Sequence, residues 1–445
     1  MRADPDSVLV RIRTELVRWH RSANELCQRL EISQPTLSRA LRRMGSEVLV
    51  AGKGRKTRYA LHRLVRDVTT PVPIYEMRSP PVTLGHLFPV QGGDAFYIES
   101  HHGDLLGGWY DDWPWFLYDL RPSGYIGRSL PQRYPHRGFP ADVLRWSADH
   151  VLAYLTHDGF DAVGSLVLGD AAYTAWMEQG PKPVLSRGDY TRFATDALRW
   201  GPVGSSAAGE HPKFVVPGDP GFIVKFSPVI EEKKDRRRAD LLIAEHHALE
   251  VLREHGISAA NSDIFEDGGR IFLEVERFDR CGQERLGQIT LTAFNAEFVG
   301  SVGDWIEACA GLHRTGHLSF GDLQRVRFIQ RFGEWIANSD MHFSNLSFRT
   351  QGTRLLGLTP VYDMTPMLYQ VAGAEIVERS FEPKVHPGDA DIAHAVQAAA
   401  LDFWARVRDC GLISEDFRRI AAQNRDAVEA LSGKLVRLPM SGGTA

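Results

Sequence analysis

Residues 335–367 read WIANSDMHFSNLSFRTQGTRLLGLTPVYDMTPM, and this stretch decides how the rest of the chain is interpreted. An apolar helical run leads to Asp340, and Asn345 follows five positions later. A predicted hairpin with its turn at Gly352 then leads to a second acid, Asp363. A carboxylate, an amide five positions on and a second carboxylate after a hairpin form the D-x-x-x-x-N…D arrangement of kinase active sites.

The chemistry of such sites explains why these residue types recur. The first Asp orients and deprotonates the attacking hydroxyl, whereas the Asn and the second Asp hold Mg²⁺ on the nucleotide phosphates. The alternative is a polar loop with a solvated Asp and an Asx turn, because D-x-x-x-x-N recurs by chance in a long chain. The order of motifs upstream favours the kinase interpretation.

A Gly/Ser-rich segment and a lysine in an apolar strand precede this stretch. Residues 201–213 are small and flexible and run into a predicted strand, so their backbone N–H groups can cradle phosphates. Lys225 lies in the mostly apolar run FIVKF, where a cation needs a partner. In a kinase this lysine binds the nucleotide phosphates and pairs with a helix glutamate. We choose Glu245 of the predicted helix 239–255, with Glu250 as the second candidate.

The next segments complete the order. A charged run at 231–238 is interpreted as a solvated loop. A predicted strand at 270–275 leads into residues 276–280, where a two-lobed kinase would cross between its lobes and bind adenine through backbone groups. Each motif is weak by itself, but all of them follow in the correct order over about 160 residues. This order favours a kinase.

The N-terminus has the pattern of a winged helix-turn-helix domain. Apolar residues at helical spacing over 7–21 are followed by a second helix capped by Ser22. A recognition helix over 34–44 begins after Ser33 as its N-cap. Two strand-like runs then flank a basic Gly-Lys-Gly-Arg-Lys tip, the predicted wing. We expect this domain to bind double-stranded DNA, with a solvated basic face on a protein–protein module as the alternative.

The residue types that read DNA lie on the predicted recognition helix and wing. Polar and basic side chains are expected to reach base edges in the major groove, and further cations to contact phosphates. The predicted DNA-binding residues are Gln34, Thr36, Ser38, Arg39, Arg42, Arg43, Lys53, Arg55, Lys56 and Arg58.

Charge and cysteine usage bound the function. Residues 1–66 hold 15 Lys and Arg against 6 Asp and Glu, a net charge of +9, whereas the other residues sum to −13 within a total of −4. Four scattered cysteines without a C-x-x-C pair argue for a reducing compartment and against a cysteine-based zinc site. We see no signal core and no apolar run of membrane-spanning length, so we expect a cytoplasmic protein without membrane contact.

The middle of the chain is interpreted as scaffold. From residue 83 to 126, short strands alternate with Gly turns. Aromatic residues at 109–116 suggest either a ligand cage or, as we favour, the core of a small β-subdomain. His101-His102 lacks partners at metal-ligand spacing and is predicted to be loop.

Taken together, these residues resemble the HipA-type serine/threonine kinases of bacterial toxin–antitoxin systems, and the winged helix makes the chain similar to the YjjJ-like subgroup. The resemblance covers about residues 80–430. Its most specific pieces are SAAGEHPK at 206–213, VK at 224–225, VERFDR at 275–280, NSDMHFSN at 338–345 and Tyr362-Asp363. It implies an α+β fold, a two-lobed HipA-type protein-kinase-like fold with a small N-terminal β-subdomain, preceded by the winged helix-turn-helix domain.

The resemblance also implies ATP and Mg²⁺ as cofactors, with a role for each matched residue. Asp340 would be the catalytic base, and Asn345 and Asp363 would be the Mg²⁺ ligands. Lys225 would bind the ATP phosphates. The further residues expected to bind nucleotide are Glu276 and Phe278, through their backbones, with Asp279, Ser206, Gly209 and Lys213.

Autophosphorylation is expected at Ser206, or at Ser205 beside it, and would eject the phosphate loop and switch the enzyme off. The expected domains are 1–66 (winged helix), 67–200 (linker and β/helical subdomain), 201–280 (ATP-binding lobe), 281–437 (helical catalytic lobe) and 438–445 (disordered tail). The resemblance implies a protein substrate such as an aminoacyl-tRNA synthetase. It leaves open an antitoxin partner and a homodimer.

The chain departs from the family in one respect. The typical toxin relies on a separate DNA-binding antitoxin, whereas this chain carries a DNA-binding head of its own. Two alternatives therefore stay open beside the kinase toxin. One is a DNA-binding transcription regulator whose kinase-like body senses nucleotide. The other is a metal-dependent enzyme acting on DNA, in which Asp340 and Asp363 ligate metals.

Overall fold

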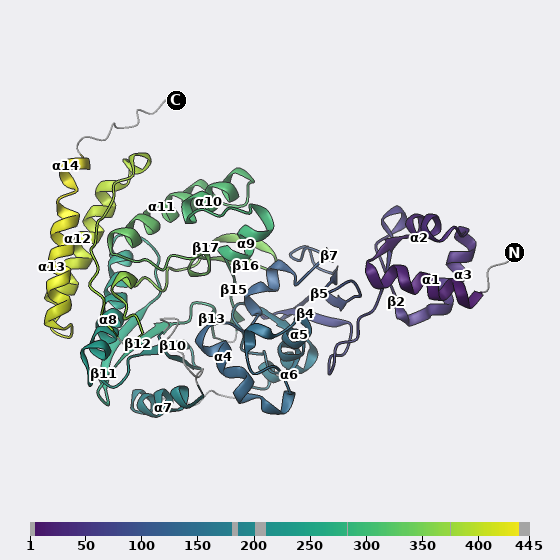
Figure 1. Cartoon of the computed structure of the whole chain (residues 1–445), viewed down its shortest axis with the longest axis horizontal. Helices are drawn as coiled ribbons and strands as arrows, with labels where there is room; N and C mark the ends of the chain where they lie inside the picture. The colour runs from purple at the N-terminus through teal and green to yellow at the C-terminus, as the bar shows by residue number, and fades with distance from the viewer. Residues whose placement is uncertain (1–4, 180–185, 201–210, 283, 374, 436–445) are drawn as a thin grey trace. The chain divides into compact units, whose positions relative to one another are not determined.

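The computed structural model describes residues 5–179, 186–200, 211–282, 284–373 and 375–435 (Figure 1). The chain forms two compact units. Unit 1 consists of Met1–Arg121, Leu144–Gln179 and Gln351–Arg354, and unit 2 of Pro122–Val143, Gly180–Thr350 and Leu355–Ala445. These units differ from the predicted domain limits, because the boundary at residue 66 lies inside unit 1 and the predicted domain 67–200 is shared between both units.

The head, residues 5–62 of unit 1, consists of three helices and a three-stranded sheet in the order β1-β3-β2. Ser22 and Glu25 form a capping box at the start of the second helix, so the predicted N-cap is confirmed. Ser33 likewise caps the third helix, whose bounds match the prediction. The elements are α1 (Pro5–Arg18), β1 (Arg21–Ser22), α2 (Ala23–Leu30), α3 (Gln34–Met44), β2 (Val48–Ala51) and β3 (Arg58–Leu61).

Apolar residues of all three helices form the core of the head, among them Ile12, Leu26 and Leu37. Trp19 behaves differently from its prediction. The sequence pattern placed it on the first helix, but α1 ends at Arg18, and Trp19 packs in a second cluster with residues such as Leu49 and Trp109. This cluster joins the head to the larger sheet of unit 1.

That larger sheet is antiparallel, with five strands in the order β7-β6-β5-β4-β8. Trp113, Trp115 and Phe116 are buried, which confirms the core interpretation for these three aromatic residues. The elements around it are β4 (Val72–Glu76), β5 (Val82–Pro89), β6 (Phe96–Ser100), β7 (Gly108–Tyr110), α5 (Ala148–His157), β8 (Leu166–Leu168) and α6 (Asp170–Met177).

Unit 2 contains a four-stranded antiparallel sheet in the order β11-β12-β10-β9, covered by the long helix α8. Helices α4 and α7 join this unit because Tyr125 of α4 and Ala197 of α7 lie in one core with Phe214. The elements are α4 (Gly124–Arg133), α7 (Tyr190–Trp200), β9 (Lys213–Val216), β10 (Phe222–Phe226), α8 (Lys233–Glu254), β11 (Ser262–Asp267) and β12 (Arg270–Glu276).

The remainder of unit 2 is mainly helical. The predicted hairpin at 346–358 is present as β16 and β17, and β15 adds a third strand that the sequence analysis missed. Helices α12 and α13 lie side by side (Figure 1). The elements are β13 (Arg280–Cys281), β14 (Glu284–Arg285), β15 (Gly287–Thr290), α9 (Leu291–Phe298), α10 (Trp305–Arg314), α11 (Phe320–Trp335), β16 (Ser347–Gln351), β17 (Arg354–Leu358), α12 (Ala393–Asp409), α13 (Glu415–Glu429) and α14 (Ser432–Leu435).

The prediction of a loop for the charged run 231–238 is wrong. From Lys233 onward this run forms the first turns of α8. Arg237 is buried, with its guanidinium 5.0 Å from the Phe417 ring centroid. The Asp240 carboxylate is buried as well and accepts a hydrogen bond at 2.9 Å from the backbone N–H that precedes α13. The charge pattern alone suggested a solvated segment. These tertiary contacts stabilise it as a helix instead.

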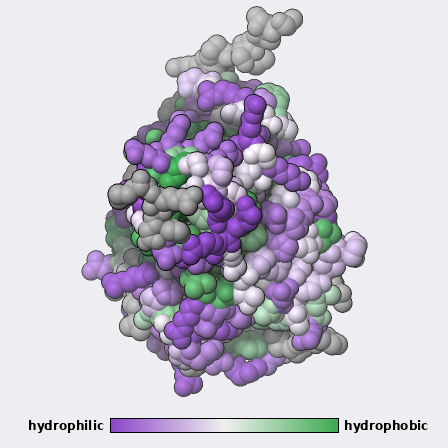
Figure 2. Space-filling view, turned by 90° about the vertical axis from the view of Figure 1, so that its right-hand side faces the viewer, coloured by the Kyte–Doolittle hydropathy of each residue, from purple (hydrophilic) through white to green (hydrophobic). Residues whose placement is uncertain are grey.

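Within the described residues, we find no helix that combines the length and the apolar character needed to cross a membrane. The face shown in Figure 2 is mostly hydrophilic, with small, separate hydrophobic spots. The predicted disordered tail, 438–445, lies outside the described residues.

Candidate active site

Lys225 lies at the centre of a buried cluster of charges in unit 2. It belongs to β10, and its side chain is 9% exposed. Its Nζ donates to Glu245 Oε1 of α8 at 2.6 Å and also to Asp363 Oδ1. Glu245 Oε2 in turn accepts from the Thr365 hydroxyl at 3.0 Å. The pairing with Glu245 confirms the sequence-based choice of helix glutamate, and it gives each buried charge a partner.

Electrostatics in this cluster favour the charged forms of Lys225 and Asp363. Burial by itself would raise the pKa of Asp363, but Lys225 and Lys213 together with the hydrogen bond from Lys225 outweigh burial and lower the pKa to about 2. Burial by itself would lower the pKa of Lys225, but Asp363 and Glu245 raise it. The pKa of Glu245 is raised because burial outweighs the attraction of Lys225. The cluster therefore keeps the buried Lys225 ammonium and the partly exposed Asp363 carboxylate charged.

Asp340 and Asn345 lie in the loop that follows α11. The Asp340 side chain is 50% exposed, and its backbone N–H donates to Asn338 Oδ1 at 3.0 Å. Asn345 Nδ2 donates to the Asp340 carbonyl at 2.8 Å. Because its nitrogen is used in this way, Asn345 would bind a cation through Oδ1. The loop thus presents one carboxylate and one amide oxygen.

Close packing on α11 holds this loop in place. Asn338 is buried, and its N–H donates to the Gly333 carbonyl at 2.9 Å. Its Nδ2 lies 3.5 Å from Met364 Sδ, next to the segment that carries Asp363. A Cβ on Gly333 would lie 2.4 Å from Met341 Sδ, so any larger residue there would require the flexible Met341 side chain to move. Asn338 and Gly333 therefore help to position the loop that carries Asp340 and Asn345.

Two residues of the predicted phosphate loop are described. Lys213 begins β9 directly opposite Lys225 on β10. His211 Nε2 is buried and has no hydrogen-bond partner among the described residues. Burial, together with Lys225 and Lys213, lowers the pKa of His211 to about 3. An unpaired buried nitrogen beside two lysines fits an anionic ligand such as a phosphate. The predicted residues Ser205, Ser206 and Gly209 lie outside the described residues.

The segment predicted to hold adenine follows β12. The Glu276 N–H donates to the Asn261 carbonyl at 2.8 Å, and the Glu276 carboxylate accepts from Asn261 Nδ2 at 2.9 Å. Phe278 has its ring centroid 5.8 Å from that of Tyr362. Since the N–H of Glu276 is engaged, its carbonyl is the backbone group that would contact adenine.

Asp279 lies deeper than the resemblance suggested. Its carboxylate is buried and accepts from Arg277 at 3.0 and 3.1 Å and from Arg280 at 2.7 Å. Both oxygens are thus bound by protein cations, so an effect of Asp279 on nucleotide binding would be indirect. The two predicted metal ligands, in contrast, fit Mg²⁺. The Asp363 carboxylate and the Asn345 amide offer oxygen atoms, the ligands that this ion prefers.

The head presents most of its predicted DNA-binding residues to solvent. Thr36 is half-buried in the first turn of α3, where its hydroxyl lies 2.9 Å from that of the N-cap Ser33. Arg58 departs from the prediction, because β3 pairs with β1 and turns its side chain toward Glu25 and His20, at 3.1 and 2.6 Å. The exposed set is Gln34, Ser38, Arg39, Arg42, Arg43, Lys53, Arg55 and Lys56.

Sequence reasoning missed several residues of the site. His211, Asn338 and Thr365 stand within or beside the recognised motifs, but their roles depend on contacts with other segments. Gly333 lies inside a predicted helix, where a glycine costs stability. Its presence there was the one available signal of close packing at this position.

Comparisons with known proteins show the family of the chain. Residues 68–177 match the family model of the YjjJ-like toxin middle domain, and residues 205–431 match that of the HipA-like C-terminal domain. The toxin YjjJ of Escherichia coli (strain K12) is 34% identical to this chain over 446 residues, which cover 95% of this chain and 98% of that protein.

Two solved structures are also similar. One is HipA from the toxin–antitoxin system of Shewanella oneidensis MR-1, in complex with HipB and operator DNA, with a TM-score of 0.49, 14% identity, and coverage of 81% of this chain and 97% of that chain. The other is the Helicobacter pylori proinflammatory kinase CtkA, with a TM-score of 0.39, 10% identity, and coverage of 52% and 93%. Family membership rests on the sequence matches alone: the chain belongs to the HipA-like family and, within it, to the YjjJ-like toxins.

Proposed function

We propose that the chain is the kinase toxin of a toxin–antitoxin system, a Mg²⁺- and ATP-dependent protein kinase that phosphorylates serine or threonine and carries a DNA-binding head. The observation that supports this most strongly is the contact of the buried Lys225 ammonium with both Glu245 and Asp363. A lysine held between a helix glutamate and an acid after a hairpin is the arrangement with which kinases bind nucleotide phosphates. The alternative is an ion pair with a purely structural role, but such a pair would not require the D-x-x-x-x-N loop as well.

Bound Mg-ATP would supply the γ-phosphoryl group and neutralise its charge. Lys225 holds the phosphates, Glu245 fixes the position of Lys225, and Asp363 and Asn345 hold the metal. Lys213 and the buried His211 face the same region and favour an anion there. Glu276 and Phe278 hold adenine through their carbonyl and N–H groups.

The exposed Asp340 carboxylate accepts the proton of the substrate hydroxyl. That hydroxyl oxygen forms a bond to the γ-phosphorus while the bond from phosphorus to the β–γ bridging oxygen breaks, and ADP leaves. An exposed base fits a protein substrate, because the hydroxyl has to arrive on a second macromolecule. Autophosphorylation at Ser206 or Ser205 remains part of the proposal, with an aminoacyl-tRNA synthetase as one class of external substrate.

The head is proposed to be a winged helix-turn-helix that binds double-stranded DNA. Arg39, Arg42 and the wing residues Lys53, Arg55 and Lys56 are all exposed, which is the placement that phosphate and base contacts need. In this proposal the head acts on the promoter of its own gene, alone, as a homodimer or together with an antitoxin.

Intact mass of the purified chain before and after Mg-ATP tests the kinase proposal, with Asp340→Ala as the inactive control. We expect a phosphate on the wild type alone. An unchanged mass of the wild type, starting from protein first treated with phosphatase, together with ATP binding to it, would contradict kinase activity. It would favour the nucleotide-sensing regulator, for which the exposed basic residues of the head are the supporting observation.

A further inference from the structure

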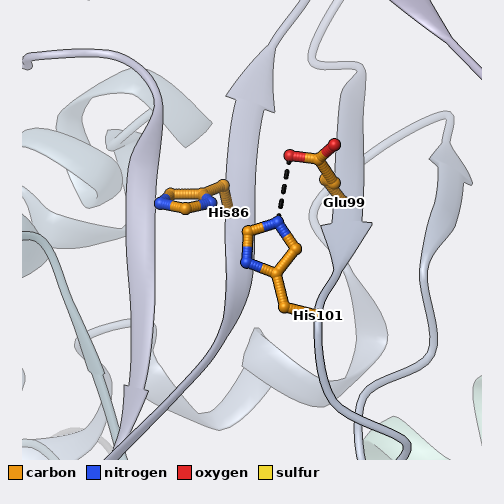
Figure 3. A group of neighbouring side chains, drawn as sticks. All are labelled: His86, Glu99 and His101. Atoms are coloured by element: carbon orange, nitrogen blue, oxygen red, sulfur yellow. Dashed lines mark hydrogen bonds and ion pairs between the residues drawn. The ribbon is translucent and has the colours of Figure 1, made fainter.

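Two histidines and a glutamate converge on the outer face of the large sheet of unit 1. His86 of β5 lies directly opposite Glu99 of β6 in the antiparallel register. His101 follows two positions after Glu99, so both side chains point to the same side of the strand. Figure 3 shows the imidazole of His101 between the other two side chains. Sequence reasoning predicted a loop at His101-His102, which the structure confirms, but it did not anticipate that His86 and Glu99 lie beside His101.

The distances within this His86–Glu99–His101 cluster are close to those of a metal site. His101 Nε2 lies 3.2 Å from Glu99 Oε2, and the ring centroids of His86 and His101 are 4.8 Å apart. One ligand atom of each residue lies within 4.8 Å of the others. Zinc binds nitrogen and oxygen at about 2 Å, so its ligand atoms lie roughly 3.3 Å from one another. Small rotations of exposed side chains would close the remaining gap.

The surroundings of the cluster favour a cation. Glu99 contributes a carboxylate, and Asp170 at the start of α6 acts on His86 electrostatically. Glu99 and His101 are exposed and His86 is half-buried, so an ion from solvent has access.

We propose that His86, Glu99 and His101 bind a divalent transition-metal ion, with Zn²⁺ as the reference ion. Two imidazole nitrogens and one carboxylate oxygen suit zinc and its neighbours, and they disfavour Mg²⁺ and Ca²⁺, which prefer oxygen ligands alone. Three protein ligands leave a coordination position for water or for a group of another molecule. This site is distinct from the proposed Mg²⁺ ligands Asn345 and Asp363, which belong to unit 2.

Occupancy of the site has a structural consequence inside unit 1. The metal would connect β5 and β6, which are held together at this point only by the sheet. Two positions further along the same face, Phe88 and Tyr97 pack in the cluster that contains Leu49 and Trp19 of the head. Metal binding therefore stabilises the part of the sheet on which the head rests.

A second histidine cluster is the weaker candidate. His246, His247 and Glu250 of α8 also lie within ligand distance of one another. However, Glu250 lies 3.8 Å from the Arg406 guanidinium, and His246 Nδ1 lies 3.0 Å from the Ser262 hydroxyl. The nearby Arg406 guanidinium opposes a metal ion at this second cluster.

The test uses the full chain without an affinity tag, titrated with Zn²⁺ by calorimetry and with Co²⁺ by visible absorption. We expect one Zn²⁺ per chain and an intense Co²⁺ band typical of low coordination. His101→Gln and His86→Gln should weaken binding by at least about tenfold and remove the band, since each removes a ligand. His102→Gln is the matched control, because this neighbouring side chain lies instead 3.2 Å from Asp104.

The thermal unfolding midpoint gives a second readout that does not require the variants to lose affinity completely. Excess Zn²⁺ should raise the midpoint of the wild type and of His102→Gln, but not that of His101→Gln. Glu99→Gln, which keeps the shape of the side chain, should behave like His101→Gln. Equal Zn²⁺ affinity in the wild type and His101→Gln would overturn the proposal, and so would loss of binding in His246→Gln alone.

Discussion

Lys225 and Arg39 are both cations that the sequence predicts to be functional, but their burial and their partners differ. Lys225 is buried and held by two carboxylates, Glu245 and Asp363. Arg39 is exposed on α3, where its Nε donates to the Pro35 carbonyl one turn earlier in the helix, at 3.3 Å. A buried functional charge has to be fixed by partners that the fold supplies, whereas an exposed one keeps its freedom until a ligand arrives. This difference predicts that a substitution at Lys225 lowers the stability of the chain, whereas a substitution at Arg39 weakens the binding of DNA.

The largest effect is expected at the exposed base of the catalytic loop. Asp340→Asn removes the proton acceptor but keeps the shape of the loop, so phosphotransfer should fall by about 10²–10⁴-fold. ATP affinity and stability should change little, because the side chain is exposed. Initial rates and nucleotide titration measure both. Ser339→Ala, at the adjacent exposed position, is the control, and wild-type rates in Asp340→Asn would refute the assignment.

Removal of the buried cation should act on stability instead. Lys225→Met leaves the Glu245 carboxylate buried with only Thr365 as a partner, which should lower the free energy of unfolding by about 3–5 kcal/mol. Urea denaturation measures the loss. The double variant with Glu245→Leu should recover part of it, because an apolar pair avoids the buried charge. Arg39→Met should stay within about 0.5 kcal/mol of the wild type, and a comparable loss there would break the contrast.

His20 of the head is another buried ionisable group, and it should make the stability of the chain depend on pH. It is 8% exposed, and burial together with Arg58 lowers its pKa to about 4. As the pH falls below about 6.5, the unfolded chain binds the proton first, so the free energy of unfolding should fall by about 3 kcal/mol between pH 6.5 and 4.

Urea midpoints across this pH range should show that loss in the wild type and a smaller loss in His20→Asn. His136→Asn, at an exposed position, serves as the substitution control. Parallel profiles for the wild type and His20→Asn would show that His20 does not carry this pH dependence.

The smallest effect is expected for DNA binding. Arg39→Ala should weaken binding to a mixed-sequence duplex by about 1 kcal/mol and lower the salt slope by about 1, if it contacts a phosphate. Arg58→Ala should leave the slope unchanged, because Glu25 and His20 already hold that guanidinium. Salt-dependent anisotropy titrations measure both variants. A slope lowered by Arg58→Ala and not by Arg39→Ala would reverse the assignment.

Local sequence features predicted much of the fold and part of the site. The caps Ser22 and Ser33 gave the helix starts of the head, because a cap acts within three residues of itself. The turn chemistry around Gly352 likewise predicted β16 and β17. The order of motifs selected Glu245, since a lysine in an apolar strand needs a carboxylate from a neighbouring helix. The charged start of α8 was misread because its partners lie on α13, almost 180 residues later.

What the sequence by itself determined is therefore the set of elements with strong local signals and the identity of the charged residues that need an explanation. The tertiary structure alone decided which of those residues meet. Strand register placed His86 opposite Glu99, the pairing of β3 with β1 turned Arg58 inward, and close packing on Gly333 brought Asn338 beside Met364. The physical reason is that periodicity and capping act over a few residues, whereas register and packing depend on the whole unit.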